Sequence, residues 1–88
     1  MKAALVTAKH GRFWALPTDM ISRHLTEHGV WGEPELGLCL DILEKAPGDV
    51  VEAGAHIGTH TVPIARKCAE LGRRVLALEP QARLLNLL

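Results

Sequence analysis

The chain has 88 residues, no net formal charge and 48% hydrophobic residues. This composition excludes an intrinsically disordered chain, and the balanced charge removes the electrostatic case for a nucleic acid or an anionic membrane surface as a partner. Its apolar runs are shorter than a membrane-spanning segment or a signal-peptide core, so we expect a cytoplasmic protein.

The chain contains two cysteines, Cys39 and Cys68. A secreted disulfide scaffold would carry cysteines at a much higher density. Because both residues fall within apolar helical patterns, we expect buried, reduced thiols at both positions.

The chain opens on a pattern that is typical of a β-hairpin. The apolar runs Ala3–Ala8 and Phe13–Leu16 flank a polar segment in which Gly11 is expected at the turn. Pro17 ends the second run.

Two helices are predicted next. Thr18 or Asp19 can cap a helix over Met20–His28, and Gly29 can end it. A second helix is expected over Pro34–Lys45, because proline is favoured in the first turn of a helix. The apolar residues assigned to inner faces are Ile21 and Leu25 in the first helix, and Leu36, Leu40, Ile42 and Leu43 in the second.

A strand, a glycine turn, a helix and a second strand follow. Val50 and Val51 are β-branched and come after a Pro-Gly breaker, so they predict a short, fully buried strand. Helical spacing of apolar residues predicts a helix over Thr59–Leu71, and Arg74–Leu78 is typical of another strand. After Pro80, the segment Gln81–Leu88 begins a further apolar helix.

Gly54 and Gly58 shape the turn between the first of these strands and its helix. Any such turn can need glycine for a positive φ or for tight packing, so the pair alone is a weak indicator of a cofactor. The dinucleotide fingerprint G-x-G-x-x-G is absent, because His56 and Thr59 stand where its second and third glycines would be.

Two carboxylates accompany this loop. Glu52 lies within an apolar strand, where an acid needs a partner such as the ammonium group of a ligand. Glu79 ends the next strand, a position from which an acidic residue can bind ribose hydroxyls, although an exposed side chain without such a role is the alternative. An acid suited to a diol, beside a loop that is not built for phosphates, favours S-adenosylmethionine over a dinucleotide.

The histidines are spaced in a way that also suggests metal binding. His24 and His28 are four residues apart, as are His56 and His60, which places both members of each pair on one face of a helix. No H-E-x-x-H motif or cysteine pair supplies further ligands, so we expect solvated helix-face histidines and no metal site. His56 is interpreted as a loop residue that lies beside the cofactor.

No catalytic residue can be assigned from the sequence. Ser22 is the only serine and lies in no nucleophile elbow, so a Ser-His-Asp triad has no support. Trp31 is either a core anchor or an aromatic that faces a ligand, and we favour the core.

Together these motifs resemble the opening of the FkbM family of class I S-adenosylmethionine-dependent methyltransferases. The similarity lies in V-V-E-A-G-A-H-I-G-T-H-T over residues 50–61 and R-V-L-A-L-E-P over residues 74–80. An Asp-Ile-Ser type segment (Asp19, Ile21, Ser22), the sequence G-x-W-x-E-P over residues 29–34 and P-G-D over residues 47–49 precede them in the family's order.

The resemblance implies an α/β fold in which a hairpin and two helices precede the start of a Rossmann-like sheet with two parallel strands. It places the methionine side of the cofactor at Glu52, Gly54 and Gly58, and the ribose at Glu79. The full set of expected cofactor-binding residues is Glu52, Gly54, Ala55, His56, Gly58, Thr61 and Glu79. His56 is a departure, because the family typically carries asparagine there.

The expected organisation is a hairpin and helical segment over residues 1–46 and the first part of the cofactor domain over residues 47–88. The family fold has five more strands, so we expect a truncated enzyme that lacks its acceptor site and self-associates when isolated. By resemblance, its partner would be a small molecule or sugar methylated on oxygen. The alternatives are a non-catalytic remnant or interaction fragment, and a fragment of a nicotinamide-dependent oxidoreductase.

Overall fold

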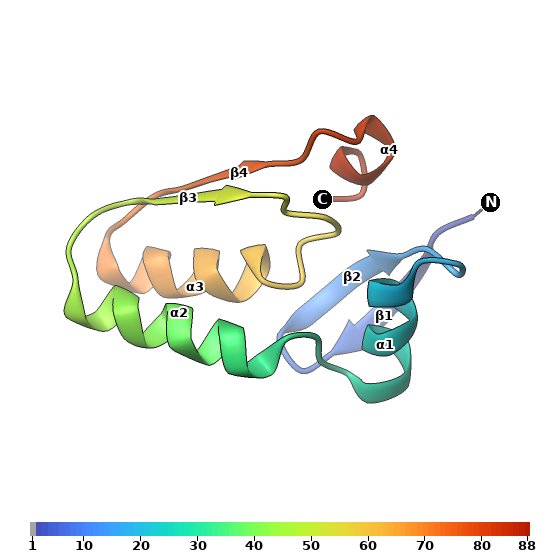
Figure 1. Cartoon of the computed structure of the whole chain (residues 1–88), viewed down its shortest axis with the longest axis horizontal. Coiled ribbons are helices and arrows are strands. Elements are labelled where there is room, and N and C mark those ends of the chain that lie inside the picture. Colours follow the sequence, from blue (N-terminus) through green and yellow to red (C-terminus); the bar gives the residue numbers. More distant parts are fainter. Residues whose placement is uncertain (1) are drawn as a thin grey trace.

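The computed structural model of the chain describes residues 2–88 and shows an α/β arrangement (Figure 1). An antiparallel hairpin comes first, two helices follow, and two parallel strands joined by a third helix precede a short fourth helix, as the sequence predicts. Within residues 2–88, no helix combines the length and the apolarity needed to cross a membrane. In chain order the elements are β1 (Ala4–Ala8), β2 (Gly11–Ala15), α1 (Met20–His28), α2 (Glu33–Lys45), β3 (Val50–Ala53), α3 (Thr61–Leu71), β4 (Val75–Leu78) and α4 (Ala82–Leu85).

The hairpin is tighter than the sequence predicts. Strands β1 and β2 pair over their full length, so the turn consists of Lys9 and His10 alone. Gly11, predicted at the turn, is instead the first residue of β2. Along β2, Phe13 and Ala15 are buried while Arg12 and Trp14 are exposed, which is the alternation expected of a strand with one covered face.

Helix α1 begins and ends where the sequence predicts. The Asp19 carboxylate accepts a hydrogen bond from the backbone N–H of Ser22 at 2.8 Å, so Asp19 is the N-cap. Gly29 ends the helix in the left-handed conformation with φ of 76°. Leu25 is buried as predicted and Ile21 is half-buried, but the inner face also contains the fully buried Ser22.

Helix α2 is tied at its first residue to the hairpin turn. The Glu33 carboxylate lies 2.8 Å from Nζ of Lys9 and 2.5 Å from Nε2 of His10. The hydrogen bond from Lys9 and then that from His10 hold the pKa of Glu33 below its ordinary value. These two contacts fix the N-terminal end of α2 against the hairpin.

The buried stripe of α2 is narrower than predicted. Leu36 and Leu43 are buried and Leu40 is half-buried, but Ile42 is 52% exposed. Cys39 is exposed as well, so the prediction of two buried thiols is correct only for Cys68. Helix α2 packs mainly against α3, and one neighbouring helix covers only part of its circumference.

Strands β3 and β4 form a parallel pair in the register Val50 opposite Val75 to Ala53 opposite Leu78. Helix α3 makes the crossover between them, and α2 and α3 lie on the same side of the pair (Figure 1). The core on that side consists of buried Leu36, Leu43, Ile64 and Cys68, with Leu40, Val50 and Val75 packed against it.

The other face of the β3–β4 pair is uncovered within the described chain. Val51 is 69% exposed and its register partner Leu76 is 58% exposed, and Leu78 lies on the same face. The prediction of a fully buried strand is therefore wrong for Val51, and Val50 is only half-buried. Strand alternation sends every second side chain away from α3, where no described helix packs.

A second core joins the hairpin and α1 to the later part of the chain. It consists of Phe13, Ala15, Leu16, Leu25, Ile57 and Leu84. Ile57 comes from the segment between β3 and α3, and Leu84 comes from α4. These two side chains attach the parallel-strand unit to the N-terminal elements.

The uncovered face leads us to expect that the chain self-associates and binds the dye ANS, because contiguous exposed apolar surface favours both. Val51→Thr should lower dye fluorescence and apparent mass while changing the free energy of unfolding by less than about 0.5 kcal/mol. Val50→Thr, on the covered face of the same strand, is the control and should destabilise by about 1–3 kcal/mol by burying a hydroxyl. A wild-type chain that elutes as a sharp monomer without binding dye would contradict this expectation.

Candidate functional site

The candidate site is the loop that follows β3, at the edge where β3 and β4 both end. The backbone N–H groups of Gly54 and Ala55 donate to the carbonyl oxygen of Leu78 at 2.7 and 3.0 Å. This shared acceptor ties the start of the loop to the last residue of β4. In open α/β sheets, ligands bind outside the carboxyl ends of the strands, which is where this loop lies.

The two loop glycines have different surroundings. Gly54 has φ of 76° and Gly58 has φ of 94°, a conformation that L-residues with side chains rarely adopt. A Cβ atom on Gly54 would meet nothing within 4 Å, so this side of the loop is open. A Cβ on Gly58 would lie 2.8 Å from Cδ1 of Leu88, so the last residue of the chain covers that glycine.

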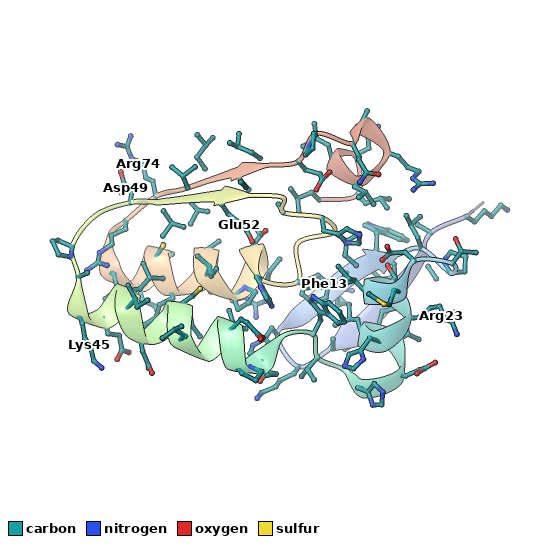
Figure 2. All side chains as sticks on the ribbon, viewed as in Figure 1. Phe13, Arg23, Lys45, Asp49, Glu52 and Arg74 are labelled. Carbon is teal, nitrogen blue, oxygen red and sulfur yellow. The ribbon has the colours of Figure 1, made fainter. Side chains whose placement is uncertain are left out.

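Glu52 points from β3 toward the beginning of α3 (Figure 2). Its carboxylate accepts a short hydrogen bond from the hydroxyl of Thr61, the first residue of α3. The positive end of the α3 dipole also favours a carboxylate at this place. An acid in an apolar strand thus has a partner within the chain, in addition to any ligand ammonium group.

Glu79 fastens the loop to the end of β4. One carboxylate oxygen accepts the backbone N–H of His56 at 2.8 Å, and the other accepts the N–H of Gln81 at 2.9 Å. The side chain is half-buried. An ionised carboxylate offers about four lone-pair sites, so Glu79 retains acceptor capacity beyond these two bonds.

His56 is held from a second direction by Asp19, the N-cap of α1. Nε2 of His56 lies 3.1 Å from Oδ1 of Asp19, while Oδ2 of Asp19 accepts the Ser22 N–H. Burial raises the pKa of Asp19, but the hydrogen bonds from Ser22 and the contact with His56 outweigh burial and lower it. Nδ1 of His56 is buried without a hydrogen-bond partner.

Three of the four paired histidines depart from the prediction of solvated helix faces, and His28 on α1 confirms it. His56 and His60 both precede α3, and Nε2 of His60 lies 2.8 Å from the carbonyl oxygen of Trp31. His28 is exposed, but the half-buried His24 contacts both the His28 ring and the Trp31 ring. Among residues 2–88 no group of three or more possible ligands could hold a metal ion.

Trp31 is half-buried and lies outside both core clusters. It borders a surface hollow together with His24, Gly32, Glu35 and His60. From the sequence we favour a core position for Trp31, and the structure shows that this prediction is wrong.

The structure brings the predicted site residues together in two pairs. Glu52 meets Thr61, and Glu79 meets the backbone of His56, while Ala55, within the loop, is buried. From the sequence, Asp19 is expected as a helix cap and as part of the Asp-Ile-Ser type segment, but its contact with His56 is not expected. No local signal could have revealed that contact, because the two residues are 37 positions apart.

Comparison of the chain with protein-family models, with curated proteins and with solved structures found no match.

The lowered pKa of Asp19 predicts a pH dependence of stability. Because the folded pKa lies below the unfolded value of about 3.9, the carboxylate stabilises the fold above that pH, and the contribution disappears as pH falls through the folded pKa. Urea unfolding of Asp19→Asn, which keeps an N-cap but cannot titrate, should approach that of the wild type as pH is lowered from 5 to about 2. Asp41→Asn, at an exposed position on α2, is the control. A difference in the free energy of unfolding between wild type and Asp19→Asn that stays constant over this pH range would show that the ionised Asp19 carboxylate does not stabilise the fold.

Proposed function

We propose that the chain is the N-terminal, S-adenosylmethionine-binding portion of an FkbM-like methyltransferase with a Rossmann-like sheet. The observation that carries the proposal is the hydrogen bond between Glu79 and the glycine loop, at the shared carboxyl edge of two parallel strands. This bond places an acid suited to ribose hydroxyls directly beside a loop with an open glycine. The sequence resemblance supplies the family.

The charges around the loop support a cationic ligand. Three carboxylates, those of Asp19, Glu52 and Glu79, contact the loop or the first residue of α3. Within residues 2–88, none of the hydrogen bonds to loop residues comes from a lysine or arginine. S-adenosylmethionine carries positive charge on its sulfonium and ammonium groups, whereas a dinucleotide carries a negative pyrophosphate. Coulomb interaction with these carboxylates therefore favours S-adenosylmethionine.

The residues present fit this cofactor in their chemistry. Glu79 retains free acceptor sites for a ribose diol, and Glu52 retains acceptor sites for an ammonium group. The open surface at Gly54 admits a ligand close to the backbone. At Gly58 the Leu88 side chain must move before a ligand can make the same approach.

The cofactor supplies a methyl group activated by the sulfonium. In this proposal Glu52, Gly54 and Gly58 hold the amino-acid end, Glu79 orients the ribose, and Ala55, His56 and Thr61 shape the loop between them. Methyl transfer depends chiefly on positioning, which is the task of these residues. The acceptor, a small molecule or sugar methylated on oxygen by family resemblance, would bind to residues that the family places on later strands.

One observation favours a second candidate, a non-catalytic segment in which the glycine loop has only a structural role. Leu88 covers Gly58, and Leu84 of α4 is buried in the hairpin core beside Ile57. The C-terminal residues thus use the loop as a packing surface. Binding measurements distinguish this candidate from the first.

Calorimetric titration of the wild-type chain with S-adenosylmethionine should show binding, and Glu79→Gln should weaken it. A ribose hydroxyl bonded to a charged group contributes about 1.5–3 kcal/mol. Glu70→Gln, an exposed position on α3, is the matched control and should bind as the wild type does. Equal affinity of Glu79→Gln and wild type, with an unchanged far-UV circular dichroism spectrum, would remove Glu79 from the site.

We expect no methyl transfer by the 88-residue chain itself, because the family places the acceptor site on later strands. The measurement is release of S-adenosylhomocysteine in the presence of pooled small-molecule and sugar acceptors, with Glu52→Ala as the background. Release by the wild-type chain above this background would show that the first 88 residues contain an acceptor site.

A further inference from the structure

His56 is the one non-glycine residue with a positive φ among the described residues, at 57°. The left-handed conformation is unfavourable for a residue with a side chain, although histidine tolerates it better than most. Such a conformation persists only where surrounding contacts hold it in place. The contacts at His56 therefore determine the shape of the glycine loop.

Two carboxylates hold His56, and they come from distant parts of the chain. Glu79, at the end of β4, accepts its backbone N–H, and Asp19, at the start of α1, lies 3.1 Å from its Nε2. The Glu79 contact depends on the backbone conformation, because the direction of the N–H changes with φ. The Asp19 contact fixes the side chain that this backbone carries.

Asp19 is itself held firmly enough to act as a fixed point. Its second oxygen caps α1 by accepting the Ser22 N–H at 2.8 Å. The Ser22 hydroxyl in turn accepts the backbone N–H of Leu16 at 3.0 Å, which anchors the start of α1 to the end of the hairpin. Ile57, next to His56, is buried in the same core as Leu16.

The Asp19 contact also selects one form of the imidazole ring. An ionised carboxylate can only accept, so Nε2 of His56 must carry the hydrogen. Nδ1 is buried and has no partner, so a proton there would be an unsatisfied buried donor. The contact with Asp19 therefore requires a hydrogen on Nε2.

We propose that Asp19 is a positioning residue for ligand binding: through Nε2 of His56 it holds the glycine loop in the left-handed conformation that places the His56 N–H on Glu79. The ligand-binding part of this inference rests on the proposed function. In this proposal the Glu79 carboxylate keeps one orientation toward a ribose only while the contact between Asp19 and His56 is intact.

The test is a double-mutant cycle with Asp19→Asn and His56→Gly. Asparagine caps a helix about as well as aspartate, so Asp19→Asn keeps α1 but replaces the acceptor that faces Nε2. Glycine reaches a φ of 57° without help from a side chain, so His56→Gly keeps the loop conformation and removes the coupling. Glu33→Gln is the matched control, because it changes a carboxylate–imidazole pair with His10 away from the loop.

Nitrogen-detected NMR of the full chain should show His56 protonated at Nε2 in the wild type and altered in Asp19→Asn. The amide signals of His56 and Gly58 should shift in Asp19→Asn and stay in place in Glu33→Gln. Calorimetry should give roughly tenfold weaker S-adenosylmethionine binding for Asp19→Asn, the loss expected for one hydrogen bond to a charged group. In the His56→Gly background, Asp19→Asn should change neither the loop signals nor the affinity.

Wild-type tautomer and loop signals in Asp19→Asn would overturn the positioning role, as would an equal effect of Asp19→Asn with and without the His56 side chain. The NMR and calorimetric readouts separate the two proposals. A wild-type chain that binds no S-adenosylmethionine but shows the coupled loop signals would overturn the proposed function and support the coupling between Asp19 and the loop.

Discussion

The burial of Ile57 is the packing constraint on which the arrangement of this chain depends. Ile57 lies in the loop between β3 and α3, yet its side chain is buried among Phe13, Leu16 and Leu25 of the N-terminal elements. Full burial of an isoleucine side chain contributes roughly 1.5–3 kcal/mol, comparable to the strongest polar contacts of the loop. The residues on either side, His56 and Gly58, are therefore held close to the hairpin and α1.

This constraint gives the loop two supports of different kinds. Apolar packing at Ile57 fixes the distance between the loop and the hairpin, but this packing has little directional preference. The hydrogen bonds of Glu79 and Asp19 are directional, so they determine how the backbone turns at His56. An apolar anchor flanked by polar contacts allows a glycine-rich loop to keep one shape while its Gly54 side remains open.

Local signals in the sequence were sufficient for most of the elements. The cap at Asp19, the stop at Gly29 and the proline in the first turn of α2 are determined within a few residues, so α1 and α2 start and end close to the predicted positions. Helix α3 begins at Thr61 rather than Thr59, because the loop continues for two further residues. Strand β4 is likewise one residue shorter than predicted.

Burial could not be predicted in the same way, because it depends on which faces have neighbours. Val50 and Val51 are equally apolar, but only Val50 points toward the helices. Ile42 and Cys39 lie in an apolar helical pattern whose outer side has no covering element in the described chain. The contact between Asp19 and His56 joins residues 37 positions apart, and no periodicity or local motif connects them.

The different environments of the two cysteines make the chain selectively addressable by thiol chemistry. Cys68 is only 1% exposed, whereas Cys39 lies on the outer surface of α2. Reaction at a thiol requires access to the sulfur, so a maleimide fluorophore or spin label would attach at Cys39 in the folded chain. In an oxidising solution the Cys39 thiols of two copies of the chain would form a disulfide. This disulfide would not involve the glycine loops.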